Sequence, residues 1–93
     1  MFLGRVIGSV VSNAKHPSYQ GIKLMLVRPT DPQGNLEPNG TMVAVDAVGS
    51  GVGDWVLVAS EGLACSEILD LPVRIPIREI IVGQVDRVEV KKR

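Results

Sequence analysis

Two apolar runs of strand length, separated by a glycine-rich segment, constrain the fold of this chain more than any other feature of its sequence. The first run covers residues 43–48, the glycines fall within Gly49-Ser50-Gly51-Val52-Gly53, and the second run is Trp55-Val56-Leu57-Val58-Ala59. In a phosphate-binding loop the glycines are followed by a helix, whose N-terminal amides hold the phosphates. The aromatic and β-branched run after Gly53 favours a strand instead. We therefore expect a tight turn between two strands, with glycines at positive φ angles.

Further apolar runs precede and follow this pair, each bounded by turn-forming residues. We predict strands over residues 2–12, 22–27, 41–48, 54–59 and 79–90. Between them we expect a turn at residues 30–35, a short α-helix over 60–67 with Ser60 as its N-cap, and an irregular connector at 71–78 that contains Pro72 and Pro76. The pattern predicts one all-β domain over residues 1–93, a small five-stranded OB-like β-barrel with one short α-helix.

Several of the predicted strands are apolar on both faces. Residues 22–27, 42–48, 55–59 and 80–85 carry apolar side chains at odd and even positions, whereas a small antiparallel barrel has one wet face and alternates. The chain has no room for the crossover helices that cover parallel sheets. We infer that another subunit buries the outer faces, and Val45 and Val56 are the candidate interface positions. A charge at an outward position should break the oligomer, and a charge at an inward position should unfold the chain.

Charge and composition argue against several function classes. Ten basic residues balance ten acidic ones, and the chain has one Phe, one Tyr and one Trp, so it lacks the basic groove and stacking platforms of a nucleic-acid binder. No window approaches the roughly 18 uninterrupted apolar residues of a membrane span, and the N-terminus does not resemble a secretion signal. The single Cys65 excludes a disulfide within the chain. We expect a cytoplasmic protein with neither nucleic-acid nor membrane partners.

Side chains with catalytic or metal-binding chemistry are few and scattered. His16 is the sole histidine and has no nucleophile or carboxylate placed near it in the sequence. One histidine and one cysteine cannot assemble a zinc site within one chain, and the carboxylates lack the spacing of a calcium loop. We predict no enzyme activity, no catalytic residues, no metal and no cofactor.

Asp46 is the unusual carboxylate, because it stands in an apolar strand. It either pairs with an arginine such as Arg28 or faces a surface between subunits. An unpaired buried carboxylate costs several kcal/mol, which favours the ion pair.

Four segments in chain order carry a resemblance to a known family. They are Val10-Val11-Ser12, Gln20-Gly21-Ile22-Lys23-Leu24, Asp31-Pro32-Gln33-Gly34 and, above all, the motif over residues 45–58 with its Asp46, its glycines and Trp55-Val56-Leu57. Together they resemble the EutN/CcmL family of bacterial microcompartment and carboxysome vertex proteins. The connector at 71–78 departs from the pattern of that family.

The resemblance implies an OB-related barrel assembled as a homopentamer that caps the vertices of a polyhedral microcompartment shell in the bacterial cytoplasm. Its implied partners are hexameric or pseudo-hexameric shell proteins. One loop of each copy then approaches the fivefold axis, and we place Gly49, Ser50 and Gly51 there, with Ser50 lining the opening; the alternative is a plain hairpin turn at the periphery. The alternative function is a small OB-like module that binds single-stranded nucleic acid or another ligand.

Overall fold

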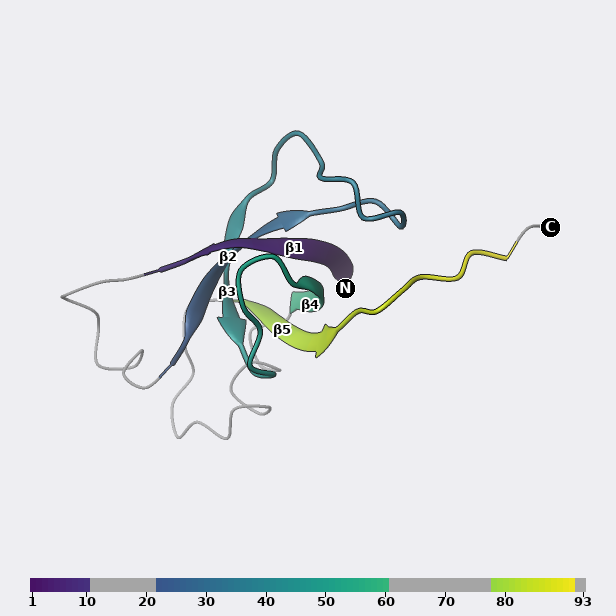
Figure 1. Ribbon diagram of the computed structural model, residues 1–93. Coiled ribbons are helices and arrows are strands. Elements are labelled where there is room, and N and C mark those ends of the chain that lie inside the picture. Colours follow the sequence, from purple (N-terminus) through teal and green to yellow (C-terminus); the bar gives the residue numbers. More distant parts are fainter. Residues whose placement is uncertain (11–21, 61–77, 92–93) are drawn as a thin grey trace.

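Five β-strands close into a barrel in the computed structural model, which describes residues 1–10, 22–60 and 78–91 (Figure 1). The strands are β1 (Phe2–Ser9), β2 (Leu24–Pro29), β3 (Met42–Asp46), β4 (Trp55–Ser60) and β5 (Glu79–Gln84). The predicted five-stranded barrel is therefore confirmed. The predicted helix over 60–67 begins at Ser60, which is the last residue of β4, and its remainder lies outside the described residues. No helix in the described ranges has the length and apolar character needed to cross a membrane.

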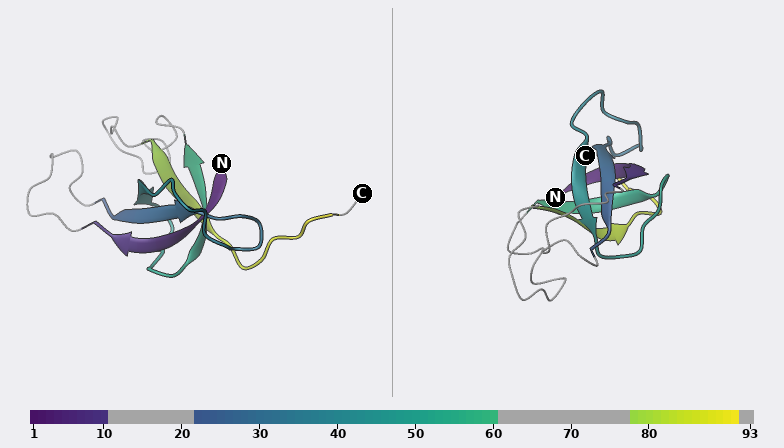
Figure 2. Two further views of the ribbon diagram at one scale, coloured as in Figure 1. Left: turned by 90° about the horizontal axis from the view of Figure 1, so that it is seen from above. Right: turned by 90° about the vertical axis from the view of Figure 1, so that its left-hand side faces the viewer.

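The order of the strands around the barrel is β1-β2-β3-β5-β4, so β3 and β4 are not neighbours although they follow each other in the chain. β5 lies between them, parallel to β3 and antiparallel to β4, as Figure 2 shows from two further directions. The glycine-rich segment consequently crosses from one side of β5 to the other. The expectation of a tight turn between two paired strands, and with it the alternative of a plain hairpin, is wrong.

The barrel interior is filled by one apolar cluster to which every strand contributes. Its buried members are Val6, Met25, Val27, Ala44, Val56, Val58 and Ile81. A second buried cluster consists of Ile22, Val45, Ala59 and Ile80. Strand register places Val45, Ile80 and Ala59 side by side across β3, β5 and β4, one residue along from Ala44, Ile81 and Val58, and thus on the opposite face of the barrel wall.

The second cluster corrects the explanation of the doubly apolar strands. Val45 and Val56 are both 0% exposed within a single chain, Val45 in the outer cluster and Val56 in the interior. Neither is a surface position available to a second subunit. The outer apolar positions of β3, β4 and β5 are in part buried by the chain itself, which the alternation rule alone could not reveal.

The fifth strand is shorter than predicted. The amide of Val85 still donates to the carbonyl of Trp55, at 2.8 Å, but Trp55 is the first residue of β4. Beyond it β4 offers no further backbone to pair with, so β5 ends at Gln84 and residues 86–91 continue without a ladder partner.

Candidate functional site

The segment that joins β3 to β4, residues 47–54, is called the crossover loop below. Gly49 and Gly53 have φ angles of 79° and 95°, in the left-handed region that favours glycine, as predicted. Gly51 is not in that region, and nothing lies within 4 Å of the Cβ that a side chain there would have. The single chain therefore explains two of the three glycines by their backbone conformation and leaves Gly51 unexplained.

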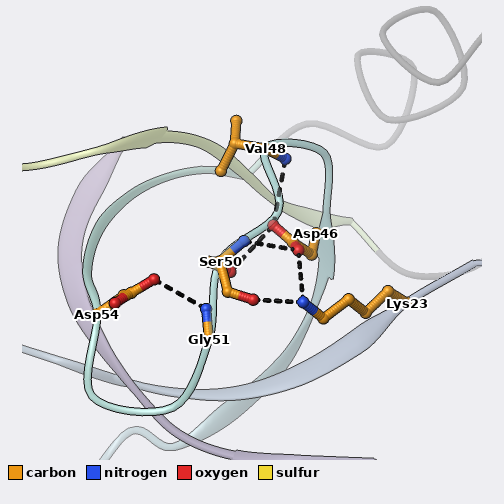
Figure 3. Close-up of polar contacts among 6 residues, drawn as sticks. All are labelled: Lys23, Asp46, Val48, Ser50, Gly51 and Asp54. Carbon is orange, nitrogen blue, oxygen red and sulfur yellow. Dashed lines mark hydrogen bonds and ion pairs between the residues drawn. The ribbon is translucent and has the colours of Figure 1, made fainter.

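The carboxylate of Asp46, at the end of β3, organises the first half of the crossover loop (Figure 3). Its Oδ2 accepts from the Ser50 amide at 2.9 Å, and its Oδ1 accepts from the Ser50 hydroxyl at 3.0 Å and the Val48 amide at 3.2 Å. An aspartate that accepts backbone amides further along the chain holds a turn in one conformation. The side chain of Asp46 is 1% exposed, so these bonds are shielded from water.

Lys23 is the ionic partner of Asp46, and the expected partner Arg28 is not. The ammonium of Lys23 lies 3.2 Å from Asp46 Oδ2 and also donates to the Ser50 carbonyl. The antiparallel register pairs Leu24 with Val45, which brings Lys23 beside Asp46 and carries Arg28 to the far end of the β2–β3 ladder. There the Nε of Arg28 donates to Thr41 Oγ1, at 2.9 Å.

Burial of Asp46 disfavours its charged form and would by itself raise its pKa. The hydrogen bonds from the Ser50 and Val48 amides, from the Ser50 hydroxyl and from Lys23 outweigh burial, and the pKa of Asp46 lies below its ordinary value. Asp46 is thus an ionised structural anchor. Four donors already occupy its two carboxylate oxygens, so it is not placed to transfer protons.

The second half of the crossover loop is tied to β1. The amide of Gly53 donates to the Val6 carbonyl at 2.8 Å, the Val6 amide donates to the Asp54 carbonyl at 3.0 Å, and the Asp54 carboxylate accepts from the Gly51 amide at 2.8 Å. Arg5 Nη1 adds a bond of 3.0 Å to the Gly53 carbonyl. Both halves of the crossover loop are therefore anchored to the barrel.

The position of Ser50 corrects the expectation that its side chain lines an opening. Ser50 is 1% exposed, and its hydroxyl turns inward to Asp46. The exposed surface of the crossover loop is instead made by Val48, Gly49, Val52 and Gly53, with Val52 65% exposed. A buried hydroxyl needs a partner, and the carboxylate four residues earlier supplies it.

Sequence reasoning missed a second polar arrangement, on the outer wall around Trp55. Its Nε1 donates to Thr30 Oγ1 at 2.8 Å, and the guanidinium of Arg5 lies 5.8 Å from its ring centroid. A lone tryptophan at a strand start gave no signal for these partners, which come from β1 and from the segment after β2. The turn at 30–35 was predicted correctly: Asp31 Oδ1 accepts from the Gln33 and Asn35 amides, each at 2.9 Å.

No catalytic or metal-binding arrangement emerges from the described ranges. Within them, no three His, Cys, Asp or Glu side chains are placed to hold a metal ion together. His16 and Cys65 lie outside those ranges. The polar network around Asp46 is built to hold a loop in place.

Comparison of the sequence with known proteins gives a match over almost its whole length. Residues 1–86 match the family described as ethanolamine utilisation protein EutN/carboxysome. The carboxysome shell vertex protein CcmL of Nostoc sp. is 37% identical over 93 residues, which make up 100% of this chain and 90% of the Nostoc protein. The bacterial microcompartment shell vertex protein PduN of Salmonella typhimurium is 50% identical over 62 residues, 63% of this chain and 68% of PduN.

Solved structures give the same result for the fold. The pentameric microcompartment shell protein GrpN of Rhodospirillum rubrum has a TM-score of 0.80 at 37% identity, over 98% of this chain and 100% of GrpN. A carboxysome subunit, CcmL, has a TM-score of 0.82 at 40% identity, over 97% of this chain and 91% of CcmL. The two relatives are named shell vertex proteins, and the structural neighbour GrpN is a pentameric shell protein.

Proposed function

The chain belongs to the EutN/CcmL family, and from this membership we propose that it is a structural shell protein, a homopentamer that caps the vertices of a polyhedral bacterial microcompartment. The observation that carries the proposal is the match of residues 1–86 to this family, together with the names of two similar proteins, which are both shell vertex proteins. These relatives are structural proteins, in agreement with the prediction that the chain is not an enzyme. No observation favours the alternative of an OB-like nucleic-acid module.

The geometry of a closed shell explains why such a protein is needed. A flat sheet of hexagonal tiles cannot close, and fivefold units at its corners supply the missing curvature. A cyclic ring requires that one patch of each copy fits a different patch of its neighbour, and it closes after five copies. Hexameric or pseudo-hexameric shell proteins are then the partners at the rim of the pentamer, and the bacterial cytoplasm is the location.

Loss of this protein is expected to leave facets intact and corners open. Cells that lack the chain and any paralogue should form elongated or leaky shells, because flat tiling needs the hexagonal units alone. Electron microscopy of purified shells checks the shape, and light scattering of the isolated protein should give about five times its mass of 10.0 kDa. Sealed polyhedra of normal shape, or a stable monomer at shell-forming concentrations, would refute the vertex function.

The crossover loop is our proposed element at the fivefold opening, with Gly49 and Gly51 closest to the axis. Gly51 supports this placement, because neither a positive φ angle nor a neighbouring atom of its own chain demands glycine there. Five copies crowded around an axis would demand it, since side chains longer than a methyl group collide with their symmetry mates. The anchors at Asp46 and Asp54 would hold five such loops in identical conformations.

Gly51→Leu is accordingly expected to weaken the pentamer while the barrel of each subunit stays folded. Because nothing lies within 4 Å of a Cβ at residue 51, the free energy of unfolding of the single barrel should change by no more than about 0.5 kcal/mol. Sedimentation measures the assembly, and circular dichroism of the dissociated chain measures the fold. Val52→Leu is the control, because this exposed position already carries a side chain. If Gly51→Leu assembles as the natural chain does, the crossover loop does not lie at the fivefold axis.

A further inference from the structure

Residues 86–91, here called the C-terminal arm, leave the barrel after β5 and make no backbone hydrogen bond within the described part of the chain. In Figure 1 the C-terminal arm, drawn in yellow, runs outward from the barrel. The family match ends at residue 86, the first residue of the C-terminal arm.

The C-terminal arm has two faces of opposite character. Arg87 Nη2 pairs with Glu89 Oε1 at 3.1 Å, and both side chains are mostly exposed. Residues two apart share a face of an extended chain, so this ion pair marks a charged face toward water. Val88 and Val90 alternate with it on the other face, and Val90 is 65% exposed. Val88 is partly buried, so the valine face is incompletely covered, which is the half-buried pattern of a strand that lacks its sheet.

The barrel carries a complementary apolar surface, called the outer-wall patch, formed by Ile7, Leu26 and Val43. Leu26 and Val43 are register partners on β2 and β3. Each precedes a residue of the interior cluster, Val27 and Ala44, and therefore points outward and stays partly exposed. Ile7 precedes Gly8, the register partner of Leu26, and is exposed. In Figure 1, β1 runs toward the left and the C-terminal arm runs toward the right.

We propose that the C-terminal arm of each copy docks its Val88 and Val90 face on the outer-wall patch of the adjacent copy. This inference rests on the pentamer of the proposed function. A second copy is the occupant because a head-to-tail ring joins two different patches of the same chain, and the arm runs away from β1, the strand that carries Ile7. Docking covers two apolar surfaces at once and leaves the Arg87–Glu89 pair in water.

The double variant Val88→Asp, Val90→Asp tests the arm, and the double variant Arg87→Gln, Glu89→Gln is its matched control. The first should raise the dissociation constant of the pentamer by more than about tenfold, since it removes apolar burial from all five contacts. The second should leave assembly unchanged. Leu26→Asp, on the receiving side, should weaken the pentamer as the valine variant does. Circular dichroism confirms that each barrel is folded.

Hydrogen exchange of the unmodified pentamer tests the docking without any substitution, so a folding defect cannot cause the result. The amides of residues 87–91 should exchange more slowly in the pentamer than in a sample diluted to monomers. A pentamer with unprotected arm amides, or one that survives the valine variant or Leu26→Asp, overturns the docking and leaves the vertex function standing. A chain that never forms pentamers refutes the vertex function itself.

Discussion

Val56→Asp is expected to prevent the barrel from folding. Val56 is fully buried in the interior cluster, whose described members are all apolar. An unpaired charge in such a site costs several kcal/mol, comparable with the whole stability of a small domain, about 5–15 kcal/mol. The yield of soluble protein and its circular dichroism spectrum measure the outcome. Val45→Asp should fail in the same way, because Val45 is buried in the second cluster.

Leu57→Asp provides the matched control one residue along the same strand. Leu57 lies on the outer face of β4 and is partly exposed, so its aspartate reaches water and the barrel should fold. A soluble, folded Val56→Asp chain, or a Leu57→Asp chain as unstable as Val56→Asp, would contradict the assignment of inner and outer faces.

Asp46→Ala is expected to lower the free energy of unfolding by about 1–3 kcal/mol, the usual cost of leaving buried hydrogen-bond donors without an acceptor, since the half-exposed Lys23 regains water. The change leaves the Ser50 hydroxyl and amide without their acceptor and Lys23 without its counter-charge. Asp46→Asn should cost less, because an amide oxygen still accepts one of these bonds. Urea unfolding at one fixed protein concentration measures the loss, since assembly also stabilises the fold. An Asp46→Ala barrel of unchanged stability would show that the crossover loop needs no anchor.

The same aspartate gives the fold an acid dependence whose sign follows from its lowered pKa. The folded state binds the proton of Asp46 more weakly than the unfolded chain, whose aspartate has a pKa of about 3.9. The stabilisation is therefore complete above that value and is lost as the pH falls below it toward the lower pKa of the folded state. The stability difference between the natural chain and Asp46→Asn should shrink on acidification from pH 6 to pH 3. Asp31, whose pKa is lowered chiefly by the Asn35 amide, acts in the same direction in both proteins and cancels.

Local features of the sequence were enough to predict the places of the five strands, the turn at residues 30–35 and the family. Runs such as Trp55-Val56-Leu57-Val58 favour extended backbone wherever they lie, and the residues from Thr30 to Asn35 form their turn through contacts a few positions apart. The positive φ angles of Gly49 and Gly53 follow from glycine itself. The motif around Asp46 and the glycines was specific enough to predict the EutN/CcmL family.

Only the tertiary structure decided which strands are neighbours. The crossover, the burial of Val45 and the ionic partner of Asp46 all depend on that choice. Insertion of β5 between β3 and β4 turned an expected hairpin into a crossover and gave Val45 a buried place on the outer wall. The β2–β3 register chose Lys23 over Arg28 as the partner of Asp46 and turned Ser50 inward. Alternation within a strand is a local property, but pairing and register come from contacts between residues far apart in the chain. No pattern within a single segment encodes them.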